Sequence, residues 1–332
     1  MTDESGPKPL GILSWGTYLP QAKIVKDLVL AKGGDPKNYL TFGWEKVCVA
    51  EGNDYPTAMC IKALKKALSQ CEVHVSQLQL VICTSTTHDY PEVVTASEVM
   101  KESGAASSCV GFDIYHGCIT TLTALEVARD WLARLGGGYA AIVSAERWVD
   151  SIDKTDRLIE SLWNFSDGAS ALIVGVDVPQ KQKLTYHGSC FSNCNDMSGY
   201  IRRSYGGARS FGTPPGENPT KRVLLPIPLQ KQWQYFSEGY TKVYTDFKTR
   251  FNTKPDWLVC NQGTPAVVEQ LAFMTRIKQP HFARSGEKYG HVGCCDLTIG
   301  FEELEKAGEL KGPGIAFSCS ASAWGAGLLK TV

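Results

Sequence analysis

A cysteine, a histidine and an asparagine stand at positions where their surroundings make them candidates for chemistry. The first, Cys118, lies between an apolar stretch at 112–116 that ends in Gly117 and a helical pattern at 119–128. This order predicts a strand-to-helix turn with the cysteine at the helix N-terminus. Unpaired N–H groups and the helix dipole there favour a thiolate, which is a good nucleophile for acyl groups. Cys118 therefore predicts an enzyme that works through a covalent thioester.

The elements around Cys118 predict a layered α/β fold. Apolar runs at 10–20, 79–86 and 140–145 have the pattern of strands. Apolar residues at helical spacing predict a helix over 54–69, and three glycines at 136–138 follow the helix after Cys118 as a cap. Strands and helices thus alternate along the chain, as they do in α/β proteins.

The second half of the chain repeats the first. Residues 78–86 are similar to 255–263, and the path from Gly117-Cys118 to the strand at 139–145 is repeated from Gly290-His291 to 315–321. Such a duplication brings equivalent loops together at a pseudo-twofold axis. Cys118 and His291 should then lie at equivalent helix starts, and Asn261 should end the second copy of a buried strand.

Two segments in the middle of the chain break this pattern. Residues 202–209 and 212–219 are rich in glycine, proline and charge. They form either a long connection at a substrate entrance or a solvated surface loop.

A duplicated α/β unit with this cysteine resembles the thiolase fold, and further segments resemble its ketoacyl-ACP synthase III branch. Those segments are 11–20, 84–91, 165–175, 288–290 and 324–327. The resemblance covers nearly the whole chain. It implies a five-layered αβαβα fold of two pseudo-twofold-related halves, residues 1–178 with the nucleophilic cysteine and residues 179–332 with the asparagine and histidine.

Two motifs depart from that branch. Synthase III enzymes have His in a His-Gln-Ala-Asn motif and Asn in a later Gly-Asn-Thr motif, whereas this chain has Asn261 at the first position and His291 at the second. Thiolases have the exchanged order and a second catalytic cysteine near the C-terminus, where this chain has Cys319. The catalytic set therefore resembles that of thiolases, on a body that resembles synthase III.

The resemblance implies a role for each of these residues. Cys118 takes the acyl group, and His291 accepts the thiol proton and later binds an enolate oxygen. Asn261 donates a hydrogen bond to that oxygen. The N–H of Cys118, with one from the Ser320-Ala321 loop, forms the oxyanion hole.

Each assignment has a structural alternative. Cys118 can be a small buried hydrophobe, His291 a helix cap and Asn261 a turn residue. For Cys319, an inert core thiol is as good an interpretation as a second acid or base.

Other polar residues are secondary candidates. His116 is a base only if Gly117 does not break the strand register, and His88 is either structural or substrate-lining. Arg202, Arg203 and Arg209 can pair with phosphates of CoA, or they belong to a solvated loop.

We therefore expect an acyl-thioester-dependent condensing enzyme or acyltransferase that forms acyl-Cys118. The exchanged motifs favour non-decarboxylating condensation, its reverse, or acyl transfer to oxygen or nitrogen, in a specialised biosynthetic pathway. One alternative is a hydroxymethylglutaryl-CoA-synthase-type enzyme, for which residues 92–94 offer a loose candidate for the required Glu. Another is a non-catalytic partner in a heterodimer.

Composition limits the partners. The 332 residues include 34 basic and 34 acidic side chains, and this zero net charge gives no reason to expect nucleic acid or an anionic membrane. No apolar run is long enough to span a bilayer, and the polar start lacks the pattern of a signal peptide, so we expect a cytoplasmic protein.

The cysteines and glycines predict no cofactor. The twelve cysteines lack paired Cys-x-x-Cys motifs, so most are better interpreted as buried hydrophobes than as metal ligands. No phosphate-binding loop is present. CoA or phosphopantetheine would enter as part of a thioester substrate, as acyl-CoA or acyl carrier protein, and the resemblance implies a homodimer. The acyl chain and the acceptor depend on pocket shape.

Overall fold

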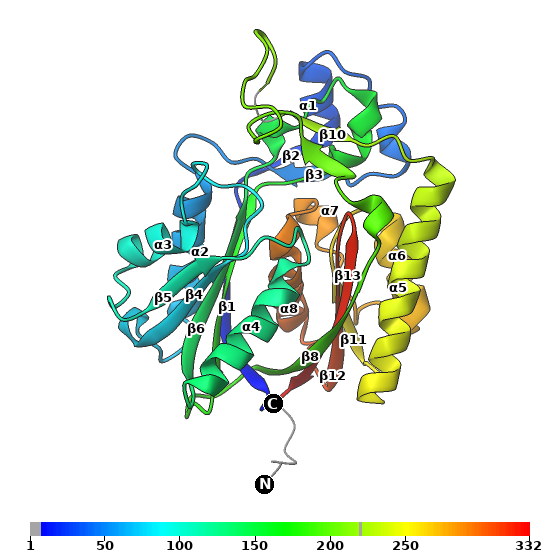
Figure 1. The fold of residues 1–332 in the computed structure, drawn as a ribbon. Helices are drawn as coiled ribbons and strands as arrows, with labels where there is room; N and C mark the ends of the chain where they lie inside the picture. The colour runs from blue at the N-terminus through cyan, green and yellow to red at the C-terminus, as the bar shows by residue number, and fades with distance from the viewer. Residues whose placement is uncertain (1–7, 219–220) are drawn as a thin grey trace.

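The structure, a computed structural model, describes residues 8–218 and 221–332. Its largest feature is a mixed nine-stranded sheet with the order β11-β12-β13-β8-β1-β7-β6-β4-β5 (Figure 1). The bounds of these strands are β1 (Leu10–Tyr18), β4 (Leu78–Cys83), β5 (Val110–Asp113), β6 (Gly138–Glu146), β7 (Gly168–Val176), β8 (Leu184–Asn193), β11 (Trp257–Cys260), β12 (Pro313–Ser320) and β13 (Ala323–Thr331). Strand β1 joins the two ends of the sheet, because it pairs with β7 and, through residues 10–12, with β8.

Helices form three layers around the two ends of this sheet (Figure 1). The outer helices are α2 (Pro56–Leu68) and α3 (Thr95–Ser103) on one side, and α5 (Leu229–Phe251) and α6 (Pro265–Thr275) on the other. Between the two ends lie α4 (Thr120–Arg134) and α8 (Asp296–Ala307), each of which contacts strands from both ends. This arrangement confirms the predicted five-layered α/β thiolase fold.

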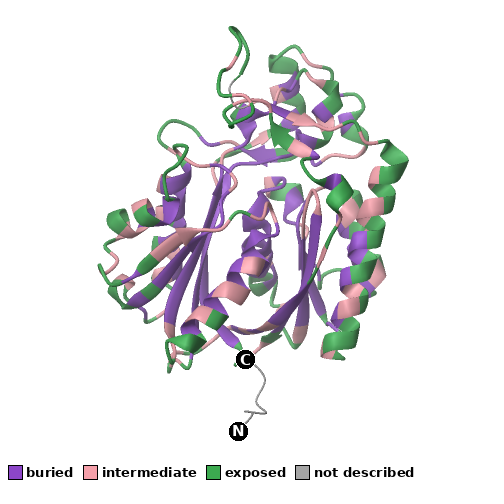
Figure 2. Cartoon of the chain, viewed as in Figure 1, coloured by how far each residue is buried: buried purple, intermediate pink, exposed green. Residues whose placement is uncertain are grey.

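The central helices are buried because most of their surface is apolar. One core cluster holds apolar residues of both helices together with strands from both ends of the sheet; from the helices it includes Leu122, Leu125, Ala128, Leu132, Leu297, Phe301 and Leu304. Figure 2 shows the strands and these two helices largely buried, while the outer face of α5 is exposed. Burial on this scale supplies the main driving force for folding.

The internal repeat is visible in the strand pairing. In one half β4 pairs in parallel with β6, and in the other half β11 pairs in parallel with β12. Helix α4 is followed by β6 of the first pair, and α8 is followed by β12 of the second pair. The predicted boundary at residue 178 falls between β7 and β8, the strands on either side of β1.

Smaller elements cover one end of the central layer (Figure 1). They are β2 (Ala22–Ile24), α1 (Val25–Ala31), β3 (Lys46–Cys48), β9 (Ile201–Arg203), β10 (Arg222–Leu224) and α7 (Gly286–Tyr289). Strand β9 pairs antiparallel with β10, so the segment expected as a loop at 202–209 begins in a strand. The glycines that follow support turns, since Gly206 and Gly216 have φ values of 86° and 84°.

Candidate active site

Cys118 lies in the turn between β5 and α4, as expected. The turn requires Gly117, whose φ is 62° and whose position leaves no room for a side chain, because a Cβ there would lie 2.7 Å from the Cβ of Ser320. Thr120 closes the turn by accepting a hydrogen bond from the N–H of His116 at 2.9 Å. Cys118 is thus fixed two residues before the helix, beside the end of β12.

His291 meets Cys118 from the second half of the chain. Its Nε2 lies 3.6 Å from the Cys118 Sγ. The two helix starts are joined on either side of this pair: the Thr121 hydroxyl donates to the Cys294 carbonyl at 2.7 Å, and the Cys294 thiol donates to the Gly117 carbonyl at 3.2 Å. The structure therefore brings together the two residues that the repeat places in equivalent positions.

Asp296 completes this arrangement, and the sequence analysis did not find it. Its Oδ2 lies 2.6 Å from His291 Nδ1 and accepts the N–H of Gln262 at 2.7 Å, and its Oδ1 accepts the N–H of Val292 at 2.8 Å. The carboxylate favours a proton on Nδ1, which leaves Nε2 free to accept the thiol proton of Cys118. An acid in the first turn of a helix is ordinary, so the only signal was its position five residues after the histidine.

Aromatic rings hold the imidazole in place. The Phe165 ring packs edge-on against His291 with a centroid distance of 4.9 Å, and the Trp148 ring lies at 5.7 Å. The backbone of His291 also forms two hydrogen bonds with the segment at 164–166. Its N–H donates to the Asn164 carbonyl, and its carbonyl accepts the N–H of Ser166. His291 is 4% exposed, so its ring has little freedom to leave the Cys118 Sγ.

The environment of Cys118 corrects the expectation of a resting thiolate. Burial raises the pKa of this thiol well above its usual range, and the charges of Glu146, Cys319 and Asp296 raise it further, while Arg222 lowers it. Cys118 therefore rests as a thiol and passes its proton to His291 as it attacks.

Glu146, at the end of β6, is the buried carboxyl that most affects this thiol. Burial raises its pKa to about 7, although hydrogen bonds from Thr86 and Thr87 oppose the shift. Its Oε1 accepts the Thr86 N–H at 3.0 Å, and its Oε2 accepts the Thr86 hydroxyl at 2.6 Å. Glu146 is the second site residue that the sequence analysis missed, since it ends a strand without a recognisable motif.

Asn261 lies beside this pair, at the end of β11, with its amide engaged by the protein. Its Oδ1 accepts the Ser318 hydroxyl at 2.6 Å and the Cys319 N–H at 2.7 Å, and its Nδ2 donates to the Gly293 carbonyl at 3.0 Å. Asn261 thus links the end of β12 to the loop that carries His291. Of its two amide N–H bonds, one remains for an oxygen of a substrate.

Cys319 also lies at this end of β12. The Tyr240 hydroxyl donates to its Sγ at 2.9 Å, and burial raises the pKa of the thiol to about 11. A thiol in this environment keeps its proton at neutral pH. Ser320 and Ala321 follow in the turn between β12 and β13, with Ser320 against Gly117, which is where the predicted second oxyanion donor would have to lie.

The side chains of the other two candidate histidines are hydrogen-bonded to threonines. His88 bonds to the Thr95 hydroxyl at 2.8 Å through Nδ1, and His116 bonds to Thr123 at 2.9 Å. Three exposed arginines lie near the β9–β10 hairpin: Arg202, Arg203 and Arg209. Their predicted contact with phosphate stays a prediction.

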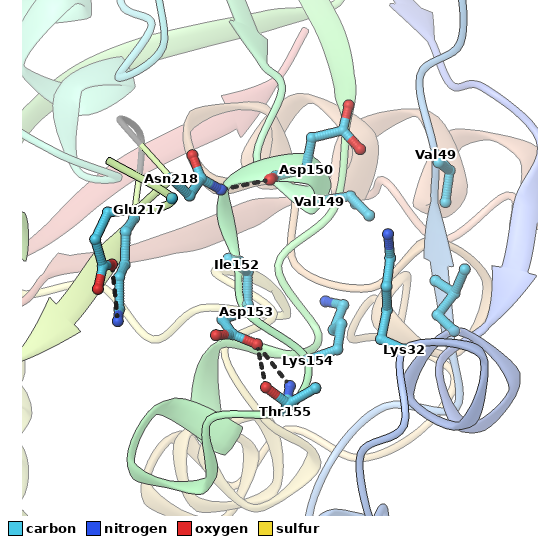
Figure 3. Close-up of a pocket in the computed structure, with 13 residues that line it drawn as sticks. Lys32, Val49, Val149, Asp150, Ile152, Asp153, Lys154, Thr155, Glu217 and Asn218 are labelled. Atoms are coloured by element: carbon cyan, nitrogen blue, oxygen red, sulfur yellow. Dashed lines mark hydrogen bonds and ion pairs between the residues drawn. The ribbon is translucent and has the colours of Figure 1, made fainter. Parts of the chain in front are cut away.

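Figure 3 shows a pocket of about 540 Å³ that is lined by residues of the segment 149–155 and by parts of other segments. It does not contain Cys118, but its lining includes Val149, which follows Trp148 in the chain. The charged side chains of the lining are Lys32, Lys154, Lys221, Asp150, Asp153 and Glu217. Burial lowers the pKa of Lys154 to about 8. Positive and negative groups balance, so the pocket itself has no strong preference for an anion.

The described residues hold neither a metal-binding cluster nor a membrane-spanning helix. Within 8–218 and 221–332, no group of three or more His, Cys, Asp or Glu side chains could hold a metal ion. In the same ranges, no helix combines the length and apolar character needed to cross a membrane. All twelve cysteines are free thiols.

Comparison with known proteins agrees with this geometry. The family model of 3-oxoacyl-[acyl-carrier-protein] synthase III matches residues 112–190, which include Cys118. The mycobacterial beta-ketoacyl-[acyl-carrier-protein] synthase III of Mycobacterium tuberculosis is 25% identical over 98% of this chain and 94% of its own length. The beta-ketoacyl-[acyl-carrier-protein] synthase III of Neisseria gonorrhoeae is 22% identical over 95% and 97% of the two chains.

Solved structures show the same fold. A crystal structure of Xanthomonas campestris OleA has a TM-score of 0.81 with 16% identity, covering 98% of this chain and 99% of its own. The 3-oxoacyl-[acyl-carrier-protein] synthase III of Aquifex aeolicus has a TM-score of 0.78 with 20% identity, covering 97% and 99%. The fold and the Cys118–His291 pair thus define a thiolase-like condensing enzyme. Within that class, the chain is most similar in sequence to the ketoacyl-ACP synthase III branch among these relatives.

Proposed function

We propose that the chain transfers an acyl group from a CoA or carrier-protein thioester to Cys118 and then joins it to a second substrate by Claisen condensation. The observation that supports this best is the 3.6 Å distance between Cys118 Sγ and His291 Nε2, with Asp296 hydrogen-bonded behind the imidazole. In the first step, His291 accepts the thiol proton as sulfur attacks the thioester carbonyl, and the thiol of CoA or the carrier leaves with a proton.

In the second step, His291, neutral again, removes the α-proton of the acceptor thioester, and the resulting enolate carbon attacks the acyl-Cys118 carbonyl. The bond to the Cys118 sulfur then breaks, and the sulfur takes back the proton from His291. The second N–H of Asn261 and the Nε2–H that His291 gains with the α-proton can donate to the enolate oxygen. The exchanged positions of these two residues relative to the usual synthase III motifs support a reaction that does not depend on decarboxylation. Cys319, which holds its proton at neutral pH, can serve as an acid in this step.

Acyl transfer to an oxygen or nitrogen acceptor is the second candidate. The Asp296–His291 pair favours it, because a carboxylate-oriented imidazole can deprotonate a hydroxyl or amine as it deprotonates the thiol. The hydroxymethylglutaryl-CoA-synthase alternative is not favoured, because its candidate acid Glu92 lies in an exposed turn. The alternative of a non-catalytic partner is not favoured, because Cys118 and His291 are in contact.

Several partners remain proposals. Relatives are named for acyl carrier protein, and one OleA crystal structure contains lauric acid and lauroyl-CoA. We take acyl-CoA and acyl carrier protein as the donors here, with no resident cofactor. A homodimer through the outer edge of β5 is supported by its place at the end of the sheet and by exposed apolar residues at Tyr90, Val93, Val94 and Val110.

Product analysis separates the two reactions. Purified protein is incubated with a labelled acyl-CoA and a second thioester, or with an amine or alcohol acceptor, and products are identified by mass spectrometry. Condensation predicts a β-keto product that disappears with Cys118→Ala. A label found only in an ester or amide would replace condensation by acyl transfer, and no Cys118-dependent product with any pair would overturn the proposed function.

A further inference from the structure

Arg222 is a buried cation that forms no ion pair with the residues that the structure describes. It begins β10, is 7% exposed, and its Nε donates to the Ser151 hydroxyl at 3.2 Å. Its Nη2 is buried and has no hydrogen-bond partner within residues 8–218 and 221–332, and no carboxylate in those ranges forms an ion pair with it. A buried, unpaired guanidinium is costly to a fold, so such a residue requires an explanation.

Arg129 shows how the same chain pairs a buried arginine when its role is structural. Arg129 is 5% exposed, and it forms ion pairs with both Glu126 and Asp130. The charge of Glu146 acts on Arg222, but the oxygens of Glu146 are already held by Thr86 and Thr87. Arg222 therefore has no carboxylate in direct contact among the described residues.

A second arginine faces the same space. In the antiparallel β9–β10 pair, Arg222 lies directly opposite Arg203, so the two side chains project from the same face of the hairpin. Like charges directly opposite each other destabilise a strand pair. An anion that binds between or beside them removes this repulsion.

This positive site lies close to the reacting groups. The Arg222 guanidinium lies over the Trp148 ring, 5.7 Å from its centroid, and the same ring lies 5.7 Å from the His291 ring. Cys118 and Leu224, which is also on β10, pack against one apolar cluster that contains Trp148. An anion at Arg222 would thus be near an acyl group on Cys118. The phosphates of CoA or phosphopantetheine lie at the far end of the pantetheine arm from the thioester.

We propose that Arg222, assisted by Arg203, binds a carboxylate at the far end of an acyl chain, so that the enzyme selects a carboxylate-bearing acyl thioester. This inference rests on the proposed function, because it names the substrate of the same site. A guanidinium binds a carboxylate through two parallel hydrogen bonds, which suits the unpartnered Nη2. An alkyl chain of the same length leaves the buried charge unpaired and is disfavoured.

The test compares thioesters of matched length, succinyl-CoA with butyryl-CoA and glutaryl-CoA with valeryl-CoA, so that the carboxylate is at the far end of the donated acyl chain. The variants are Arg222→Met, Arg222→Lys and, as a control, Arg157→Met at an exposed arginine outside β9 and β10. Rates of Cys118 acylation are measured by intact-protein mass spectrometry.

We expect the wild type and Arg157→Met to be acylated faster by the carboxylate-bearing member of each pair, by about 10- to 100-fold. Arg222→Met should lose this preference, because its rate falls far more with the carboxylate-bearing thioesters than with the neutral ones, and Arg222→Lys should be intermediate. Equal losses with neutral and charged thioesters would overturn the proposal and assign Arg222 to phosphate binding or to the fold. The absence of any preference in the wild type would also overturn it.

A binding measurement separates this proposal from the proposed function. Free succinate should raise the melting temperature of the wild type and of Arg157→Met, but not of Arg222→Met. If no thioester acylates Cys118, the proposed function fails, and the carboxylate site survives only if succinate still stabilises the protein through Arg222. An equal shift in Arg222→Met would overturn the site.

Discussion

His291 Nδ1 lies 2.6 Å from Asp296 Oδ2, and both side chains are nearly inaccessible to solvent. This contact fixes the direction in which Nε2 points, toward the Cys118 Sγ. It also explains how His291 can act as a base from the position where the usual synthase III motif has asparagine. The exchange of residue types therefore comes with a carboxylate that makes the new position functional.

Replacing Asp296 by Asn should slow acylation of Cys118. An amide can donate a hydrogen bond to Nδ1 and so favours the proton on Nε2, which is the wrong tautomer for a base. We expect a loss on the order of 10²- to 10⁴-fold in the acylation rate. Stopped reactions followed by intact-protein mass spectrometry measure it.

The matched control is Asp27→Asn, an exposed acid in the first turn of α1. It should leave the rate unchanged. A melting temperature close to that of the wild type would show that Asp296→Asn is folded. Acylation of Asp296→Asn at the wild-type rate would contradict the role of Asp296 as a positioning residue.

The reactivity of Cys118 should depend on pH as a buried thiol. Because its pKa is raised, the thiolate fraction, and with it the rate of alkylation by iodoacetamide, should still be rising above pH 9. Peptide mass spectrometry follows this rate at Cys118 alone. A rate that reaches its plateau below pH 7 would show that the resting group is a thiolate after all.

Glu146→Gln should move this alkylation profile to lower pH. The carboxyl of Glu146 has a pKa of about 7, so above that pH it is negative and opposes a second negative charge on Cys118. Below it the carboxyl is protonated, and the variant should match the wild type. Glu305→Gln, an exposed glutamate paired with Lys183, is the control and should have no effect.

Asn261→Ala should destabilise the fold as well as the reaction. The change leaves the Cys319 N–H and the Gly293 carbonyl without their partner in a buried site. A loss of about 1–3 kcal/mol in the free energy of unfolding is expected, measured by denaturant titration. Asn38→Ala, at an exposed asparagine, should cost little. Equal stability of the two variants would show that Asn261 does not link its neighbours.

The outer edge of β5 should form the contact between two copies. Val94→Lys with Val110→Lys places four like charges across a twofold interface at exposed apolar positions. Light scattering should then show a particle with the mass of one chain, whereas the wild type has twice that mass. Leu158→Lys, at an exposed leucine elsewhere, should stay dimeric. A monomeric wild type would contradict this interface.

Much of this architecture could be predicted from the sequence because it depends on local pattern. The apolar runs predicted β4 and β6. The repeat predicted β11 and placed Cys118 and His291 at matching helix starts. Gly117 and Gly290 marked the turns before those residues, and both have positive φ. A duplicated pattern is visible because each half must bury the same kind of face.

The electrostatics of the site could not be predicted in the same way. Asp296 and Glu146 act on Cys118 through space, and neither lies in a motif that differs from an ordinary helix start or strand end. The expectation of a thiolate at Cys118 is wrong for the same reason. The helix start is visible in the sequence, whereas the burial and the two carboxyls that raise the pKa of the thiol are not. The unpaired charge of Arg222 likewise depends on what is absent around it among the described residues.

Formation of acyl-Cys118 is the central claim, and intact-protein mass spectrometry tests it most directly. Wild type, Cys118→Ala and Cys319→Ala are each incubated with a panel of acyl-CoAs and acyl carrier proteins. The account predicts an adduct of one acyl group on the wild type and on Cys319→Ala, mapped to Cys118, and none on Cys118→Ala. No adduct on the wild type with any donor, or an equal adduct on Cys118→Ala, would contradict it.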